Sequence, residues 1–406
     1  MNHLARTLFL AWLLPTCSCS VGPGERTAPL PPVSDNPGVP DARDSADHAP
    51  AFPTVDNPDA TSAADNATQM TSYVKGAGHD YGVMTVSFAT DRNLLPGPAG
   101  NPKFGADRSG RFTYGTCEVS IPRDHRLGAM ESPSILRLEF RPDPDKHVVL
   151  LSTRIEDKQR FFADIKTRVR ASGNHSTFLF VHGYNVSFED AARRTAQIAY
   201  DLGFGGVPVF YSWPSQDKTV NYMVDEQTIE WAEPHLEAFL DDYLTASGAD
   251  NVYIIAHSMG NRALTRALGA LLKEKPQLAA RIGEVILAAP DIDAEVFRTQ
   301  LVPQMTGAKR PITLYASSKD RALMASGAFH GSPRAGEAGK SIVVVAGIET
   351  IDATNRSTDL ISHSYYGDND SILSDMFYMV RGRQAKDRFG LTPQQVPDGQ
   401  YWVFSR

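Results

Sequence analysis

From Ser176 onward, short and almost wholly apolar runs alternate with helical patterns, and this alternation limits the fold more than any other feature of the chain. Strands that are apolar at nearly every position are buried on both faces, as in a parallel sheet covered by helices on each side. The expected strands are residues 177–181, 207–213, 251–256, 284–288, 311–316 and 341–346. The pattern therefore predicts an α/β fold with a mostly parallel, doubly wound sheet.

Helical periodicity fills the gaps between these strands. Ser187 begins a capping sequence, and Ala191, Thr195, Ile198 and Leu202 then fall on one helical face. Residues 261–272 repeat the apolar spacing of an amphipathic helix after the third strand. A final helix is expected near residues 371–380.

A β-rich preface precedes this region. Strands are expected at residues 83–88, 111–121, 135–140 and 147–152, followed by an amphipathic helix over residues 158–170. We therefore expect a domain over residues 81–382 whose first part, residues 81–170, is this β-rich extension. Residues 383–406 are expected to form a C-terminal tail.

The N-terminus has the three-part layout of a secretory signal over residues 1–20. Its apolar run is shorter than the roughly 20 residues that span a bilayer. Residues 14–17 resemble the lipobox of bacterial lipoproteins, so two outcomes stay open: lipidation of Cys17 with anchoring in the cell envelope, or cleavage and release. Residues 21–72 are rich in Pro, Ala and Asp and predict a disordered linker. The chain is thus expected to be exported.

Composition excludes several classes of function. The 406-residue chain is 42% hydrophobic and 21% charged, with a formal net charge of −7, so neither a nucleic-acid partner nor a polyanionic substrate is expected. Cys117 is the single cysteine beyond the signal segment, which leaves no internal disulfide after processing. Phosphate loops, zinc-spaced Cys and His sets and nucleotide fingerprints are absent from the sequence, so neither cofactor nor metal is expected.

Ser258 is the expected nucleophile. The strand at residues 251–256 leads directly through His257, Ser258, Met259 and Gly260 into a helix. This strand–turn–helix sequence is typical of a nucleophile elbow, in which small flanking residues let strand and helix approach closely. Ala256 stands where the first glycine of such a motif is usual.

Two backbone amides are expected to bind a developing oxyanion. One comes from the residue after the nucleophile, Met259, and the other from a loop after an earlier strand. The strand at residues 177–181 is followed by His182, Gly183 and Tyr184, so the second donor is expected to be the Tyr184 amide.

The acid and the base should follow Ser258 in that order along the chain. Asp320 follows the strand at residues 311–316 and is the favoured acid, with Asp291, after the preceding strand, as the alternative. His363, in a loop before the final helix, is the expected general base. His330, expected in a glycine-rich loop, is the other histidine considered for this role.

Seven short motifs together resemble a family of bacterial α/β hydrolases that is described only as esterase- and lipase-like and of unknown function. These motifs are residues 90–92 (TDR), 119–122 (VSIP), 181–185 (VHGYN), 211–215 (YSWPS), 256–260 (AHSMG), 290–293 (PDID) and 363–366 (HSYY). The resemblance extends over roughly residues 81–380 and implies an α/β-hydrolase fold with a Ser–Asp–His triad. It leaves the substrate undefined.

The expected function is that of a serine hydrolase, of carboxylesterase or lipase type, that acts on a small ester or acyl substrate through an acyl-enzyme. A peptidase or acyltransferase with the same triad is the alternative, as is a non-catalytic binding protein that retains the scaffold. Trp213 and Tyr184 are expected to line an acyl pocket, although Trp213 could equally anchor the core. The oligomeric state stays open.

Overall fold

The structure is a computed structural model that describes residues 70–76, 79–97, 101–134, 139–218, 221–305, 311–355 and 372–405. These residues belong to one compact unit, Ala60–Arg406. The expected signal with Cys17, the linker up to residue 69 and the expected base His363 lie outside the described residues. No helix among the described residues is both long and apolar enough to cross a bilayer.

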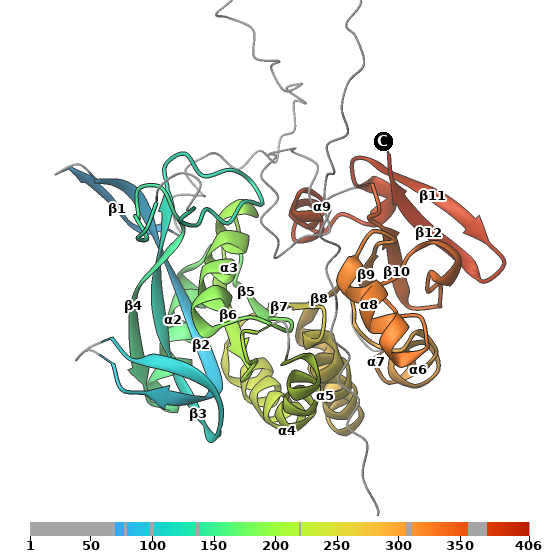
Figure 1. Cartoon of the computed structure of the whole chain (residues 1–406), viewed down its shortest axis with the longest axis horizontal. Helices are drawn as coiled ribbons and strands as arrows, with labels where there is room; N and C mark the ends of the chain where they lie inside the picture. The colour runs from blue at the N-terminus through green and yellow to red at the C-terminus, as the bar shows by residue number, and fades with distance from the viewer. Residues whose placement is uncertain are drawn as a thin grey trace, which may run out of the picture. The chain divides into compact units, whose positions relative to one another are not determined.

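A single twelve-stranded sheet runs through the described part of the chain (Figure 1). Its strands are β1 (Met70–Gly76), β2 (His79–Leu95), β3 (Lys103–Pro122), β4 (Val149–Glu156), β5 (Ser176–Val181), β6 (Val207–Ser212), β7 (Asn251–His257), β8 (Ile282–Ala288), β9 (Ile312–Ala316), β10 (Ile348–Asp352), β11 (Leu391–Val396) and β12 (Gly399–Phe404). The spatial order is β11-β12-β10-β9-β8-β7-β5-β6-β2-β3-β4, with β1 paired to β2. Pairing is parallel from β2 through β6 to β12, and antiparallel among β1 to β4 and between β11 and β12.

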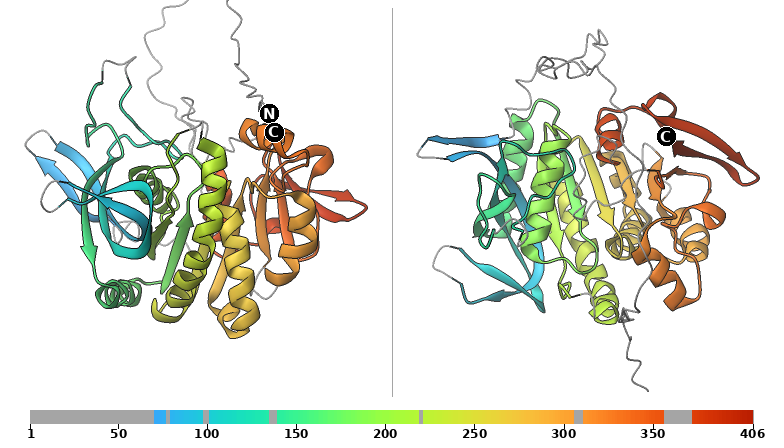
Figure 2. Two further views of the ribbon diagram at one scale, coloured as in Figure 1. Left: turned by 60° about the horizontal axis from the view of Figure 1, so that its bottom comes forward. Right: turned by 45° about the horizontal axis from the view of Figure 1, so that its top comes forward.

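Helices cover both faces of this sheet (Figures 1 and 2). The α-helices are α2 (Lys158–Ala171), α3 (Phe188–Asp201), α4 (Tyr222–Ala246), α5 (Gly260–Glu274), α6 (Ala294–Val296), α7 (Val302–Met305), α8 (Arg321–His330) and α9 (Ile372–Met379). Shorter turns of 3-10 or π type are η3 (Pro276–Arg281), η4 (Phe297–Leu301), η5 (Gly339–Ser341) and η6 (Ala385–Asp387). The buried residues form two clusters, one under α2, α4, α5 and α7 and one under α3 and α9. The prediction of a mostly parallel, doubly wound sheet with a β-rich N-terminal extension is confirmed.

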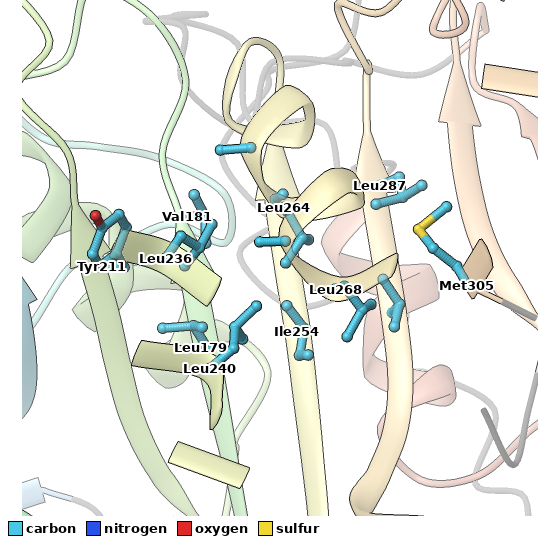
Figure 3. Packing of buried hydrophobic residues seen from close by; sticks show 14 of the residues in the cluster. Leu179, Val181, Tyr211, Leu236, Leu240, Ile254, Leu264, Leu268, Leu287 and Met305 are labelled. Carbon is cyan, nitrogen blue, oxygen red and sulfur yellow. The ribbon is translucent and has the colours of Figure 1, made fainter. Parts of the chain in front are cut away.

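The larger cluster explains why the central strands are apolar throughout. Side chains from β5 to β8 meet leucines of α4 and α5 on one face, and the opposite side chains of the same strands face α3 and α9. Figure 3 shows this packing for Leu179, Val181, Tyr211, Leu236, Leu240, Ile254, Leu264, Leu268, Leu287 and Met305. Burial of each such side chain contributes about 1.5–3 kcal/mol, so the sheet and its covering helices form one rigid support.

Local signals fix where several helices begin. Ser187 caps α3 by accepting a hydrogen bond from the Asp190 amide, as the capping sequence predicts. Asp157 caps α2 in the same way through the Arg160 amide. These caps satisfy amides that a helix leaves unpaired at its start.

The structure corrects several sequence predictions. A strand was expected at residues 341–346, but these residues form none. The strand in this part of the chain is β10, which begins at Ile348, after the end of the expected range. The strand expected at residues 147–152 is β4, shifted to Val149–Glu156, and the strand expected at residues 135–140 falls partly outside the described residues, with Glu139 and Phe140 in no strand. The segment expected to be a tail contains β11 and β12, which extend the sheet beside β10. α4, 25 residues long, was not predicted.

The order of connections creates a switch point between β5 and β7. From β5 the chain passes through α3 to β6 on one side, then returns through α4 to β7 on the other side of β5. β8, β9 and β10 then follow beyond β7. The loops after β5 and β7 therefore leave in opposite directions, and ligands of open α/β sheets bind in the crevice that such a reversal opens at the carboxyl ends of the strands.

Candidate active site

Ser258 lies at this switch point in a strained conformation. Its φ angle is +48°, in the left-handed region that residues other than glycine rarely adopt. The Ser258 amide donates to the Ala288 carbonyl of the neighbouring strand at 2.9 Å, and the Asn261 side chain donates to the Ser258 and Ala288 carbonyls. These bonds hold the turn between β7 and α5 in place.

Gly260 allows the close approach that such a turn requires. A Cβ atom on Gly260 would collide with the His182 carbonyl oxygen and would lie 2.9 Å from that of Val181. The helix start is therefore pressed against the end of β5. This geometry is that of a nucleophile elbow, with Ser258 at its apex.

The loop after β5 lies directly beside the elbow. A Cβ atom on Gly183 would lie 2.9 Å from His257 Nδ1 and 3.0 Å from Ser258 Cβ. We call residues 182–186 the β5 loop. Two of its amides are occupied, since Asn185 donates to Asp225 and Val186 donates to the Ser215 hydroxyl. The structure thus brings the loop that carries Tyr184 next to Ser258.

Trp213 packs against the first residue of the β5 loop, His182. It is fully buried, its ring stacks on His182 at 5.1 Å between centroids, and its Nε1 donates to the His182 carbonyl at 2.8 Å. Of the two roles expected for Trp213, this burial favours a core anchor over a residue that lines an acyl pocket. Tyr184 is half-buried and packs edge-to-face with Tyr222 of α4 at 5.3 Å.

Two histidines near the elbow are unsuited to act as bases. Burial, with a smaller contribution from Arg194, lowers the pKa of His257 to about 3. Burial and the charge of Arg92 likewise lower the pKa of His182 well below its ordinary value. Both rings are therefore neutral near pH 7. His182 is fully buried and hydrogen-bonded, whereas His257 is half-buried and its Nδ1 has no hydrogen-bond partner among the described residues.

Asp291 is already saturated by donors. Its Oδ1 accepts from Ser326 Oγ at 2.6 Å and from Arg334 Nε at 2.9 Å, and its Oδ2 accepts from the Tyr222 hydroxyl at 2.6 Å and from Arg262 at 3.1 Å. Burial alone would raise the pKa of Asp291, but Arg262 and the two hydroxyl donors hold it below its usual range. A carboxylate has about four acceptor sites, so this one has none left to orient a histidine.

His330 ends α8 and does not lie in the expected glycine-rich loop. Its Nδ1 lies 2.8 Å from the Ser326 carbonyl, and its Nε2 lies 2.8 Å from Glu226 of α4. Both ring nitrogens therefore already have partners other than Ser258, which makes His330 a poor alternative base.

Asp320 lies just after the carboxyl end of β9 and caps α8 by accepting from the Leu323 amide at 3.0 Å. Burial raises the pKa of Asp320 above its usual range, and the helix amides oppose that rise. The Ser318 amide donates to Thr354 Oγ1 at 3.0 Å, so the chain leading toward His363 leaves the sheet close to the loop that carries Asp320.

Sequence reasoning missed Tyr222, Arg262 and Arg334, which enclose Asp291. Arg262 follows the nucleophile by four residues and lies on the polar face of α5 with the exposed Arg266 and Lys273, so no sequence pattern distinguished it from a solvated surface charge. No group of acidic, histidine or cysteine side chains in the described part of the chain could hold a metal ion.

The fold and the elbow define the class as an α/β hydrolase. The family described as α/β hydrolase of unknown function (DUF900) matches residues 157–381, more than half of the chain, and the chain belongs to this family. None of the curated proteins matches it.

Distant similarity to solved lipases and esterases accompanies this assignment. Lipase B of Aspergillus fumigatus is 14% identical (TM-score 0.28), with 44% of this chain and 45% of that chain covered. A bacterial brefeldin A esterase, a homologue of human hormone-sensitive lipase, is 13% identical (TM-score 0.24), with 57% and 46% covered. An esterase from Rhizomucor miehei is 9% identical (TM-score 0.25), with 71% and 78% covered. The match spans less than half the length of the first two, and similarity at this level says nothing about substrates.

Proposed function

We propose that this protein is a serine hydrolase that cleaves carboxylic esters through an acyl-enzyme on Ser258. The observation that carries the proposal is the strained Ser258 turn, held at the switch point of the sheet and pressed against the β5 loop. Backbone strain of this kind costs on the order of 1–3 kcal/mol and persists where the surrounding structure enforces it, commonly at functional sites.

The proposed reaction has two steps. Ser258 Oγ attacks the ester carbonyl carbon while His363 accepts the hydroxyl proton, and the carbonyl oxygen becomes an oxyanion. The amides of Met259 and Tyr184 would stabilise that oxyanion, the first of them at the positive end of the α5 dipole. Collapse expels the alcohol, which takes the proton from His363, and water then releases the acid by the same route.

Asp320 is the proposed acid of the triad. Asp291, the alternative, has both oxygens saturated by Ser326, Arg334, Tyr222 and Arg262. Asp320 has a cap bond to Leu323 and lies close to the point where the chain leaves β10 toward His363. We infer that Asp320 would orient His363 and stabilise its charged form.

The test is labelling by a fluorophosphonate probe, read alongside hydrolysis of p-nitrophenyl butyrate. The wild type should be labelled and active, whereas Ser258→Ala should show neither property. Ser318→Ala is the matched control, because Ser318 lies exposed at the carboxyl edge of the same sheet and should be dispensable. A folded wild type that is not labelled would refute the proposal and favour a binding role. Product analysis with amide and alcohol-acceptor substrates separates an esterase from a peptidase or an acyltransferase.

A further inference from the structure

Arg92, on β2, is a buried arginine with an unusual set of partners. Its side chain is almost fully enclosed, with 1% of its surface exposed. Its Nε donates to Ser212 Oγ at 2.8 Å, and its terminal nitrogens donate to the carbonyls of Gly105, Ser215 and Val186 at 3.0, 3.0 and 2.7 Å. Within the described part of the chain, the bonds of this cation are therefore made to neutral acceptors and to no carboxylate.

The acceptors come from three separate segments. Gly105 belongs to β3, Ser212 and Ser215 lie at the end of β6 and in the loop after it, and Val186 ends the β5 loop. One Arg92 nitrogen also lies 3.5 Å from His182 Nε2, at the start of the β5 loop. The guanidinium is a rigid planar fork, so it fixes the positions of these segments relative to one another.

Asp225 of α4 holds the same loops from another direction. It accepts from the Asn185 amide at 3.3 Å, from Ser215 Oγ at 2.6 Å and from the Gln216 amide at 2.8 Å. Ser215 Oγ in turn accepts from the Val186 amide at 3.2 Å. The β5 loop is thus tied at both of its ends to one buried polar network.

We propose that Arg92 is a positioning residue that sets the β5 loop at the distance from Ser258 that oxyanion binding requires. This inference rests on the proposed function, because it assigns a role within the same site. Arg92 touches neither Ser258 nor the place where a substrate carbonyl would lie, and it acts through the backbone of Val186 and the ring of His182. A donor displaced by a fraction of an ångström stabilises the transition state less while leaving ground-state binding nearly unchanged.

Arginine is required at this position by its geometry and its charge. Burial lowers the pKa of Arg92 to about 10, with Asp91 and Asp225 opposing that change, so the side chain stays protonated at neutral pH. Lysine would keep the charge but could not reach acceptors on three segments with a planar fork.

The test compares Arg92→Lys with Arg168→Lys. Arg168 is a matched control, because its guanidinium also donates to β2, at Ser87 Oγ and the Thr85 carbonyl, but contacts no residue of the β5 loop. For each variant we would measure kcat and KM for p-nitrophenyl butyrate and the hydrogen exchange of the amides of residues 182–187.

Arg92→Lys should lower kcat by about 10- to 100-fold with KM changed less than about threefold. It should also speed exchange at Asn185 and Val186, whereas Arg168→Lys should do neither. Asp225→Asn provides a second variant should Arg92→Lys fail to fold, and it should shift both quantities in the same direction.

The outcomes separate this inference from the proposed function. Unchanged exchange in both loop variants would overturn the inference whatever the activity, and faster exchange with unchanged kcat would overturn the positioning role. A wild type that neither binds the fluorophosphonate probe nor hydrolyses the ester would refute the proposed function. Exchange alone would then decide whether Arg92 holds the loop.

Discussion

His125 should make the stability of this protein depend on pH in the alkaline range. The ring is buried between two carboxylates, with Nδ1 2.8 Å from Glu131 and Nε2 2.9 Å from Asp201 at the end of α3. Burial alone would lower the pKa of His125, but the two carboxylates raise it from 6.5 to about 9. That difference corresponds to about 3 kcal/mol of stabilisation of the folded state.

The sign follows from the raised pKa of the folded state. Below pH 6.5 the imidazole is charged in both the folded and the unfolded chain, and the full stabilisation is present. Between pH 6.5 and 9 the folded protein keeps a proton that the unfolded chain has lost, so the stabilisation falls steadily as the pH rises and is gone above about pH 9.

Urea unfolding of the wild type and His125→Asn, measured between pH 6 and pH 10, tests this prediction. The difference in unfolding free energy between the two should shrink by about 3 kcal/mol over that range. His79→Asn is the control, because the His79–Asp145 pair is largely exposed and should contribute little. Parallel curves for the wild type and His125→Asn would refute the reasoning.

Four further predictions concern the site and the core. Asn caps helices as well as Asp does, so Asp320→Asn should lower kcat by about 10³- to 10⁴-fold with little change in urea midpoint. Asp291→Asn should instead destabilise the fold by about 3–5 kcal/mol, because it leaves the buried Arg334 and the half-buried Arg262 less well paired. Severe loss of activity without loss of stability would move the acid role to Asp291. Trp213→Phe should lower stability by about 1–3 kcal/mol through loss of its bond to His182, and an unchanged urea midpoint would count against the anchor role. Burial raises the pKa of Cys117 to about 12, so iodoacetamide at pH 8 should modify it only after unfolding, as peptide mapping would show, and rapid modification of the native protein would contradict this.

The sequence predicted those parts of the fold that depend on a few consecutive residues. The runs that became β5 and β7 are apolar at nearly every position, and the turn at Ser258 joins a strand to a helix within a few residues. Such local patterns depend little on the rest of the chain, which is why the sheet and the position of the elbow could be predicted.

The error at β10 has a physical cause. Residues 342–346 are as apolar as a buried strand, yet Val343 packs into the core from an irregular segment. A turn at Gly347, with a φ angle of +88°, follows, and Ile348–Asp352 then pairs with β9. An apolar run in the sequence indicates burial but does not say which residues pair with a neighbouring strand. Residues 342–346 and 348–352 therefore could not be told apart.

The polar networks were beyond sequence reasoning for another reason. Arg92 meets acceptors up to about 120 residues away along the chain, and Asp291 gathers donors from α4, α5, α8 and the loop after α8. A single charged residue in a sequence most often indicates a solvated surface. Its role becomes visible only when the fold encloses it.

The tight contacts around Ser258 limit how this chain can diversify. A methyl group added at Gly183 or Gly260 has no space between β5, β7 and α5, so the spacing of nucleophile and neighbouring loop cannot be adjusted by small steps. Met223 in the first turn of α4 and Phe329 near the end of α8 are exposed, and Tyr222, beside both, is tied to the elbow through Asp291. Sequence change in this part of the chain, in nature or in a mutagenesis library, should therefore fall on these exposed side chains while the elbow stays constant.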